Sequence, residues 1–448
     1  MPKVHYVISG GTFVDVAPHL SLAAPAFGRV GRELAPALAE AFADLEEPAE
    51  VRLVLTRMAI GGADRDAAEL ALFKEAGIDD LRTNDDLGKF VDLLVEREDT
   101  RTIVLASATC DFAPTGLAPS YPFAAGFGKT GHPRLSSDAP HTLSMAPTDK
   151  VIRRIRKTRK DLFLVGFKTT AGAAAEEQYV KGLKLLKTAS CNLVLANDVR
   201  TGRNMVITPE QSRYHETTDR AAALEGLAEM IAQRSRLTFT RATVVPGEAV
   251  PWTSPLVPAS LRAVVDHCIE RGAYKPFLNS TVGHFAVKVD EGTILTSRRK
   301  TDFNRLDELG LVKIETSGPD TVIAHGFKPS VGGQSQRIVF AEHPGMDCIV
   351  HFHCPTKPGS AVPLRSQREF ECGSHECGKN TSDGLKPFGK VLAVMLDKHG
   401  PNIVFSRDAD PADVIRFIEA NFDLEGRTDE IAADLPLLAS LRYAAVPA

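Results

Sequence analysis

The segment Met346-Asp-Cys-Ile-Val-His-Phe-His353 ends an apolar run with two histidines. Side chains alternate between the two faces of a strand, so His351 and His353 are expected to project from one face. Neutral imidazole is a good zinc ligand, and His399, which follows a second apolar run at 391–396, is the third candidate. The pattern predicts an open catalytic site for Zn²⁺ or another divalent metal. The alternative is a set of core or surface histidines satisfied by hydrogen bonds.

Length, charge and cysteine content limit the class of protein. A chain of 448 residues is too long for one ordinary core, so two domains are the default. The formal net charge of −4 gives no electrostatic argument for a nucleic acid or membrane partner. No apolar run is long enough to predict a membrane span, and the N-terminus does not read as a signal peptide. We expect a cytoplasmic homo-oligomer that acts on small molecules.

The seven cysteines are scattered, and their odd number favours reduced thiols. Cys372 and Cys377, with His375 between them, are a second and weaker candidate for a metal site. Ordinary thiols explain this spacing better.

Strands and helices alternate over residues 1–240. The strand-like runs are 3–8, 51–56, 102–107, 162–167 and 193–196. This alternation predicts an α/β domain with a doubly wound, mainly parallel, Rossmann-like sheet that binds ligands at its carboxyl edge. Residues 241–258 hold four prolines and are expected to form a linker. Residues 259–448 are expected to form a second α/β domain with a mainly antiparallel sheet.

The run Ser9-Gly10-Gly11-Thr12 follows the first strand. Glycine lets backbone N–H groups approach an anion closely, so this turn could bind phosphate. A plain turn between a strand and a helix explains the same residues equally well.

The first half resembles the phosphopantothenoylcysteine synthetases. The matching segments, in order, are Ile8–Val14, Phe27–Ala35, Ala106–Pro114, Leu143–Ile152, Leu164–Lys168 and Leu195–Val199. The resemblance implies a site for CTP or ATP with Mg²⁺, in which a carboxylate is activated as an acyl-nucleotide and captured by an amine. Ala24 stands where that family carries an asparagine that holds the activated intermediate, so a different acid, amine or reaction is expected.

The same resemblance implies roles for single residues. Asp111 would act in catalysis beside the nucleotide and acyl group. The nucleotide-binding candidates are Gly10, Gly11, Thr12, Gly28, Phe112, Phe167, Lys184, Lys187, Asn197 and Asp198.

The turn Ser297-Arg298-Arg299-Lys300 follows a strand-like run and suits a phosphate or carboxylate group. Ser330, in a turn rich in small residues, is a further candidate for binding a substrate anion. The alternative is a solvated basic loop.

The second half resembles the class II aldolase/adducin family. The segments that carry the likeness are Asn279–Gly292, Thr296–Arg299, His343–Pro355 and Lys398–Gly400 with the helix at 410–421. The resemblance places the family's zinc ligands on His351, His353 and His399. In that family the metal polarises a carbonyl and stabilises an enediolate during aldol cleavage, epimerisation or dehydration.

Two departures from this family affect the chemistry. His284 stands where the family has a phosphate-contacting asparagine, and the family's catalytic glutamate falls near Gly332. Gln334, in the same stretch, cannot act as a general base in the usual range. His284 and Gln334 are the catalytic candidates, and His284 or His375 could replace the missing base.

The two resemblances predict a fusion of a nucleotide-dependent, ligase-like domain with a zinc-dependent lyase-like or dehydratase-like domain. Two other interpretations remain open. The first half could be a binding or assembly module beside one catalytic half. The whole chain could instead be a non-enzymatic, adducin-like interaction protein.

Overall fold

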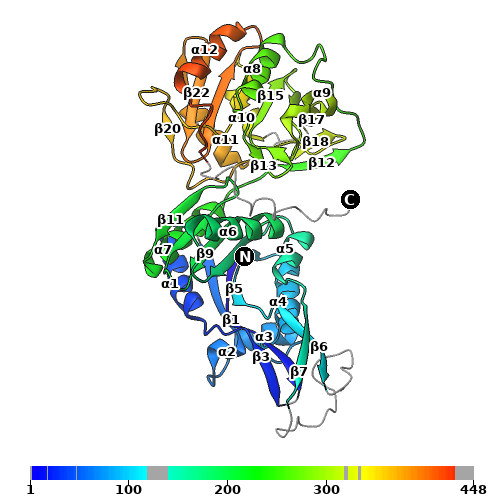
Figure 1. Ribbon diagram of the computed structural model, residues 1–448, viewed down its shortest axis with the longest axis vertical. Helices are drawn as coiled ribbons and strands as arrows, with labels where there is room; N and C mark the ends of the chain where they lie inside the picture. The colour runs from blue at the N-terminus through cyan, green and yellow to red at the C-terminus, as the bar shows by residue number, and fades with distance from the viewer. Residues whose placement is uncertain are drawn as a thin grey trace. The chain divides into compact units, whose positions relative to one another are not determined.

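The computed structural model describes residues 3–17, 19–46, 48–118, 140–316, 321–330 and 334–428. The chain divides into two compact units. One comprises Met1–Ile207 with His215–Ser235, and the other comprises Thr208–Tyr214 with Arg236–Ala448. Both units are mixed α/β structures (Figure 1). In the part of the chain described here, no helix is both long and apolar enough to cross a membrane.

The first unit is built on a seven-stranded sheet with the order β11-β10-β9-β8-β5-β1-β4. Its strands are β1 (Lys3–Gly11), β4 (Ala49–Leu55), β5 (Thr100–Ala108), β8 (Phe163–Thr170), β9 (Leu193–Asp198), β10 (Asn204–Ile207) and β11 (Arg213–Thr217). The five strands from β4 to β9 are parallel, whereas β10 is antiparallel to β9. The predicted doubly wound, mainly parallel sheet is confirmed.

The first unit also contains helices. They are α1 (Arg29–Asp44), α2 (Arg57–Ile60), α3 (Ala67–Glu75), α4 (Asn84–Glu96), α5 (Ile152–Thr158), α6 (Ala175–Ala189) and α7 (Arg220–Arg234). Every residue of β1 after Lys3 is buried, which is typical of a parallel strand covered on both faces. Helix α4 begins with a capping box between Thr83 and Asp86.

Two ribbons add to the first unit. One pairs β2 (Phe13–Ala17) with β3 (Leu20–Ala23), and the other pairs β6 (Phe112–Ala118) with β7 (Thr142–Pro147).

The second unit contains a ten-stranded sheet with the order β12-β18-β17-β16-β15-β19-β23-β22-β20, and β21 also pairs with β22. Its strands are β12 (Arg241–Val245), β15 (His284–Lys288), β16 (Thr293–Thr296), β17 (Val312–Thr316), β18 (Thr321–His325), β19 (Cys348–His351), β20 (Leu364–Arg365), β21 (Lys386–Phe388), β22 (Val391–Leu396) and β23 (Gly400–Phe405). Only the β12–β18 and β20–β22 pairs are parallel, so the predicted mainly antiparallel sheet is confirmed.

A small hairpin and several helices complete the second unit. The hairpin joins β13 (Pro276–Phe277) to β14 (Ser280–Thr281). The helices are α8 (Ala259–Glu270), α9 (Leu306–Leu309), α10 (Gln334–Glu342), α11 (His375–Gly384) and α12 (Pro411–Asn421). Phe285, Val350 and Ile403, from the three central strands, are fully buried in one hydrophobic core.

The expected linker at 241–258 is instead part of the second unit. Strand β12 pairs with β18, and the Val250 N–H donates to the Leu311 carbonyl at 2.9 Å. The Trp252 side chain is buried and donates to Asp266 at 3.1 Å. The prolines rule out a helix here, but β-branched residues still form an edge strand. The domain limits at 240 and 259 stay a prediction; the compact units divide between Ser235 and Arg236.

Candidate metal centre

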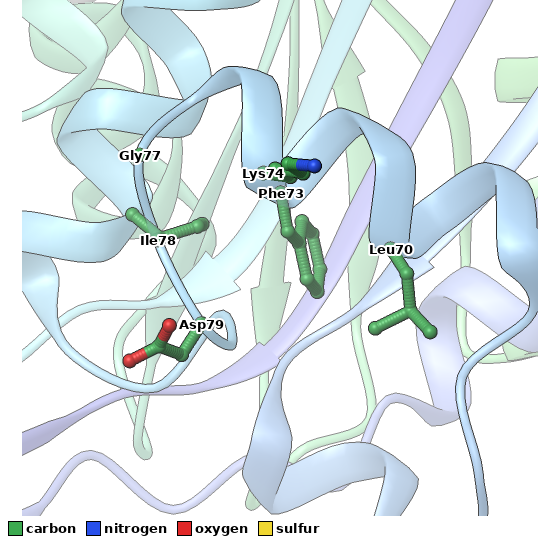
Figure 2. Close-up of a pocket in the computed structure, with 6 residues that line it drawn as sticks. All are labelled: Leu70, Phe73, Lys74, Gly77, Ile78 and Asp79. Atoms are coloured by element: carbon green, nitrogen blue, oxygen red, sulfur yellow. The ribbon is translucent and has the colours of Figure 1, made fainter.

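A shallow pocket of about 300 Å³ opens on the surface of the first unit (Figure 2). It is lined by Leu70, Phe73, Lys74, Gly77, Ile78 and Asp79, from α3 and the turn after it. None of the candidate site residues lines it, and only one acidic and one basic side chain reach it. The candidate catalytic and metal-binding side chains lie elsewhere.

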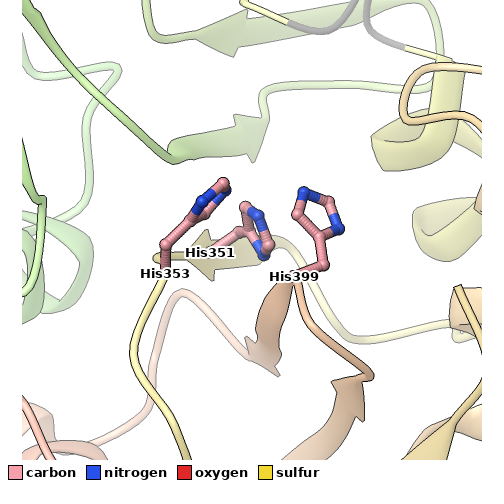
Figure 3. Close-up of side chains that lie close together, drawn as sticks. All are labelled: His351, His353 and His399. Atoms are coloured by element: carbon pink, nitrogen blue, oxygen red, sulfur yellow. The ribbon is translucent and has the colours of Figure 1, made fainter. Parts of the chain in front are cut away.

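Three histidines come together in the second unit. His351 ends β19, His353 follows two residues later, and His399 lies in the turn between β22 and β23. Their ligand nitrogens all lie within 4.8 Å of one another, and all three residues are buried. Figure 3 shows the three rings gathered at the ends of these strands. This is the trio that the sequence singled out.

Strand pairing explains why the trio assembles. His351 lies opposite Asn402 of β23, which begins directly after His399. Gly400 opens β23 with a φ of 155°, and a Cβ there would lie 2.1 Å from the Phe352 carbonyl oxygen. Only glycine therefore lets the turn that carries His399 close against the end of β19. Phe352, between the two histidines, packs in the core, and the centroid of its ring lies 5.8 Å from that of Phe422.

One hydrogen bond prepares His351 to bind a metal. Its Nδ1 lies 2.8 Å from the Pro401 carbonyl oxygen, which can only accept, so Nδ1 carries the proton. Its Nε2 is buried and has no hydrogen-bond partner among the described residues. Burial lowers the pKa of His351 to about 4, although the Pro401 carbonyl opposes this change. Three close imidazoles, one held neutral with a free lone pair, fit a divalent metal.

His284, the first residue of β15, lies beside the trio but outside it. Its ring stacks on His351 with the centroids 4.8 Å apart. Its Nδ1 lies 3.0 Å from Nε2 of Gln336, which also donates to the Thr296 hydroxyl at 3.0 Å. Burial, and to a lesser extent His351, hold the pKa of His284 well below its usual range. No local pattern in the sequence shows that Gln336 and Thr296 meet His284, because the three residues are far apart along the chain.

The other base candidates are placed as follows. Gln334 begins α10, but its side chain and residue 332 lie outside the described residues. His375 begins α11, and its Nε2 lies 3.1 Å from the Thr240 hydroxyl. Cys377 is buried beside Gln367. Among the described residues the His351–His353–His399 trio is the only group close enough to hold a metal, so Cys372, Cys377 and His375 do not form one.

The basic side chains of the turn after β16 differ in their exposure to solvent. The Arg298 guanidinium lies 3.4 Å from the centroid of the Phe327 ring and donates to the Leu309 carbonyl at 2.6 Å. Arg299 and Lys300 are exposed. The Arg298 guanidinium is thus in contact with groups of the fold, and its role in binding a substrate anion stays a prediction.

Two serine hydroxyls lie beside this turn. Ser297 and Ser330 are 2.8 Å apart, oxygen to oxygen. The Ser297 N–H donates to the carbonyl of Phe285 at 3.0 Å, so the turn is held one residue away from His284.

In the first unit, Gly10 and Gly11 are the last residues of β1 and not a turn after it, and this segment is engaged within the fold. The Gly11 N–H donates to the Ala26 carbonyl at 2.7 Å, and the Thr12 N–H donates to the Ala108 carbonyl at 3.0 Å. The Thr12 hydroxyl donates to Asn84. A Cβ on Gly11 would lie 2.0 Å from the Ala24 carbonyl oxygen. These glycines allow two segments to cross closely, which differs from the expected phosphate cradle.

Gly10 and Gly28 adopt backbone conformations that favour glycine, with φ of 121° and 77°. Gly28 immediately precedes α1. A Cβ on Gly10 would lie 2.1 Å from the Thr56 hydroxyl oxygen.

Asp198, at the end of β9, organises the turn that follows it. Its buried carboxylate accepts six hydrogen bonds, from Thr170 Oγ1, the N–H groups of Gly172, Ala173, Arg200 and Thr201, and Thr201 Oγ1. Burial alone would raise the pKa of Asp198, but these hydrogen bonds hold it well below its usual range. Its carboxylate is thus occupied within the protein.

The remaining candidates of the first unit are spread along the sheet edges. Asn197 accepts a hydrogen bond from the Thr169 hydroxyl at 3.1 Å, and Phe167 is half-buried in the neighbouring strand. Asp111 forms an ion pair with Lys150, and Phe112 is half-exposed.

Lys184 and Lys187 lie about 14 and 18 Å along α6 from its start, at a rise of about 1.5 Å per residue. Helix α6 follows β8 and leads back to the start of the parallel strand β9. Both lysines therefore lie toward the edge opposite Asn197, which differs from the expected phosphate contact.

Comparisons with known proteins agree with both predicted resemblances. Residues 267–362 match the family model of the Class II Aldolase and Adducin N-terminal domain. The chain is also 28% identical over 149 residues to the Coenzyme A biosynthesis bifunctional protein CoaBC of Thermococcus kodakarensis. That match covers 30% of this chain and 34% of the relative, so it spans about a third of the relative's length.

Two solved structures are similar to parts of the chain. The DNA/pantothenate metabolism flavoprotein from Streptococcus pneumoniae has 18% identity and a TM-score of 0.37, covering 52% of this chain and 96% of its own. An L-fuculose 1-phosphate aldolase has 17% identity and a TM-score of 0.28, covering 36% of this chain and 81% of its own. The chain joins a phosphopantothenoylcysteine synthetase-like domain to a class II aldolase/adducin-like domain.

Proposed function

We propose that this protein is a two-domain biosynthetic enzyme whose second unit is a divalent-metal-dependent, aldolase-like lyase or dehydratase. The observation that carries the proposal is the buried trio His351, His353 and His399. A buried imidazole nitrogen without a partner, such as Nε2 of His351, costs free energy unless a ligand uses its lone pair. An interaction module of the adducin type has no need of this arrangement.

The residues around the trio suit a phosphorylated or carboxylated substrate. When bound, a divalent metal such as Zn²⁺ would polarise a substrate carbonyl. The three histidines would hold it, and Pro401 keeps the proton of His351 on Nδ1. Arg299 and Lys300 offer positive charge beside the hydroxyls of Ser297 and Ser330. An anionic group of the substrate would be bound there.

The stretch 331–336 contains no carboxylate that could serve as the general base. We therefore expect the metal-loaded protein to cleave L-fuculose 1-phosphate or ribulose phosphate very slowly or not at all. A panel of other hydroxy and keto acids and sugar phosphates, assayed with and without metal, tests for the true reaction. On a substrate that turns over, Arg299→Ala should raise KM on the order of 10- to 100-fold, the effect of losing one charge-assisted contact.

The matched control is Arg305→Ala, because Arg305 is also exposed and pairs with Glu308 in a neighbouring turn. Fast cleavage of either sugar phosphate by the wild type would contradict the argument from the missing base. Equal KM values for Arg299→Ala and the control would show that Arg299 does not bind the substrate.

For the first unit we propose a nucleotide-dependent, ligase-like activity with CTP or ATP and Mg²⁺. It is supported by the parallel sheet, whose carboxyl edge carries Asn197 and the exposed Thr169. A binding or assembly role for this unit remains the alternative, because Gly11, Thr12 and Asp198 are engaged within the protein.

Calorimetry of the full chain with CTP and with ATP, in the presence of Mg²⁺, distinguishes the two roles. We expect saturable binding of one nucleotide, and we expect Asn197→Ala to weaken it about tenfold through loss of a hydrogen bond. Asn304→Ala, an exposed asparagine of the second unit, should leave binding unchanged. Absence of heat with both nucleotides in the folded protein would exclude the ligase-like role.

A further inference from the structure

A fully buried glutamine lies against the histidine that stacks on the metal trio. Gln336, on α10, contacts His284 and Thr296 through its side-chain amide. We infer that His284 serves the metal centre as a hydrogen-bond donor through its Nε2, and that Gln336 is the positioning residue that fixes it in this form. The inference rests on the proposed metal-dependent function and assigns His284 a role other than that of a base.

The orientation of the Gln336 amide follows from Thr296. The Thr296 hydroxyl lies 3.2 Å from the Phe285 carbonyl oxygen, which can only accept, so the hydroxyl hydrogen is donated there. Thr296 Oγ1 must then accept from Gln336 at 3.0 Å, and the amide atom facing it is Nε2. The two strands β15 and β16 thus determine which way the amide points.

The tautomer of His284 follows from the orientation of the Gln336 amide. Gln336 Nε2 has a second hydrogen, which it donates to His284 Nδ1 at 3.0 Å. A neutral imidazole has one donor and one acceptor nitrogen, so Nδ1 is the acceptor and Nε2 carries the proton. In this form Nε2 has no lone pair, and it can neither bind the metal nor remove a proton from a substrate. It can only donate.

The donor lies next to the metal trio. The rings of His284 and His351 are stacked at an interplanar angle of 30°, and register pairs the two residues across β15 and β19. A donor beside a metal suits a substrate that offers an oxygen acceptor, such as a carbonyl, carboxylate or phosphate oxygen. The substrate class is therefore one whose oxygen is held jointly by the metal site and by His284.

The amide is poorly satisfied as a purely structural group. Gln336 Oε1 is buried and has no hydrogen-bond partner among the described residues. An apolar side chain of similar length would avoid this burial of an unpaired acceptor. A glutamine at this position is better explained by the two hydrogen bonds that its nitrogen donates.

The test is the tautomer of His284, measured by ¹⁵N spectroscopy on the full chain labelled at histidine. The signals of His284 are identified by their loss in His284→Asn. We expect a protonated Nε2 and an unprotonated Nδ1 in the wild type, both without metal and with one equivalent of Zn²⁺. Gln336→Met, which removes both donated hydrogen bonds, should give a mixture of tautomers. Gln336→Glu, whose carboxylate only accepts, should move the proton to Nδ1.

The matched control is Gln367→Met, because Gln367 is also fully buried in the same unit but lies beside Cys377. It should leave the His284 tautomer unchanged. A wild-type His284 protonated on Nδ1 would overturn the inference even if no variant folded, as would an unaltered tautomer in both folded Gln336 variants. Failure of the wild type to bind metal would instead refute the proposed function, since the tautomer is also read in the metal-free protein.

Discussion

His351→Ala is expected to release the metal from the second unit. The substitution removes the one imidazole whose proton is held on Nδ1 by Pro401 and whose Nε2 is free to bind. Loss of a direct ligand should reduce affinity by more than the roughly 10- to 100-fold typical of an outer-shell partner. The metal content measured by elemental analysis after dialysis should fall from about one equivalent per chain to a small fraction of one.

Two comparisons make this result specific. His267→Ala removes an imidazole from the same unit, on α8, where it pairs with Glu419 at 2.9 Å, and it should keep the full metal content. Circular dichroism should show that His351→Ala retains its secondary structure. Full metal content in a folded His351→Ala protein, or none in the wild type, would rule out this centre.

Gly400→Ala is expected to destabilise the second unit and disrupt the trio at the same time. The added Cβ would lie 2.1 Å from the Phe352 carbonyl oxygen and 3.3 Å from Cε1 of His351. The Cβ would clash with this backbone carbonyl, and a φ of 155° is unfavourable for alanine. The turn that carries His399 would therefore have to move. We expect a loss on the order of 3 kcal/mol in the free energy of unfolding, measured by denaturant titration, together with loss of bound metal.

Gly389→Ala provides the matched control for Gly400→Ala. Gly389 also has a positive φ, of 64°, in a turn next to β22, but no atom of the described residues lies within 4 Å of the place that a Cβ would take. It should cost only about 1 kcal/mol, the usual penalty of this backbone conformation, and leave the metal content intact. Equal costs for the two substitutions would show that contact with Phe352 is not what requires glycine at 400.

Local patterns in the sequence were sufficient to predict the two sheets and the approach of His351, His353 and His399. The spacing of His351 and His353 follows from the two-residue repeat of an extended chain, which neighbouring residues alone determine. The parallel and antiparallel sheets likewise followed from how strand-like and helix-like segments alternate. Periodicity of this kind is a local property, so it can be read without knowing which segments meet.

Contacts between distant segments decided the rest. Residues 241–258 are rich in proline, yet they belong to the second unit because β12 finds its partner in β18, some eighty positions later in the chain. The composition of the basic turn after β16 suggested an anion site, but only the approach of Phe327 shows that Arg298 is turned inward. Likewise, glycine is required at position 11 because residues 24–26 pass close to it, and no local motif predicts that approach.

Residue identity and local periodicity were sufficient to predict that His351, His353 and His399 come together and that the chain forms two α/β units. The tertiary structure decided what surrounds the histidines. His284 meets His351 through strand register, and Gln336 reaches His284 from α10, fifty-two positions away. Proton positions and the orientation of an amide depend on such contacts, because a hydrogen bond is set by the distance and direction between two groups and not by their separation along the chain.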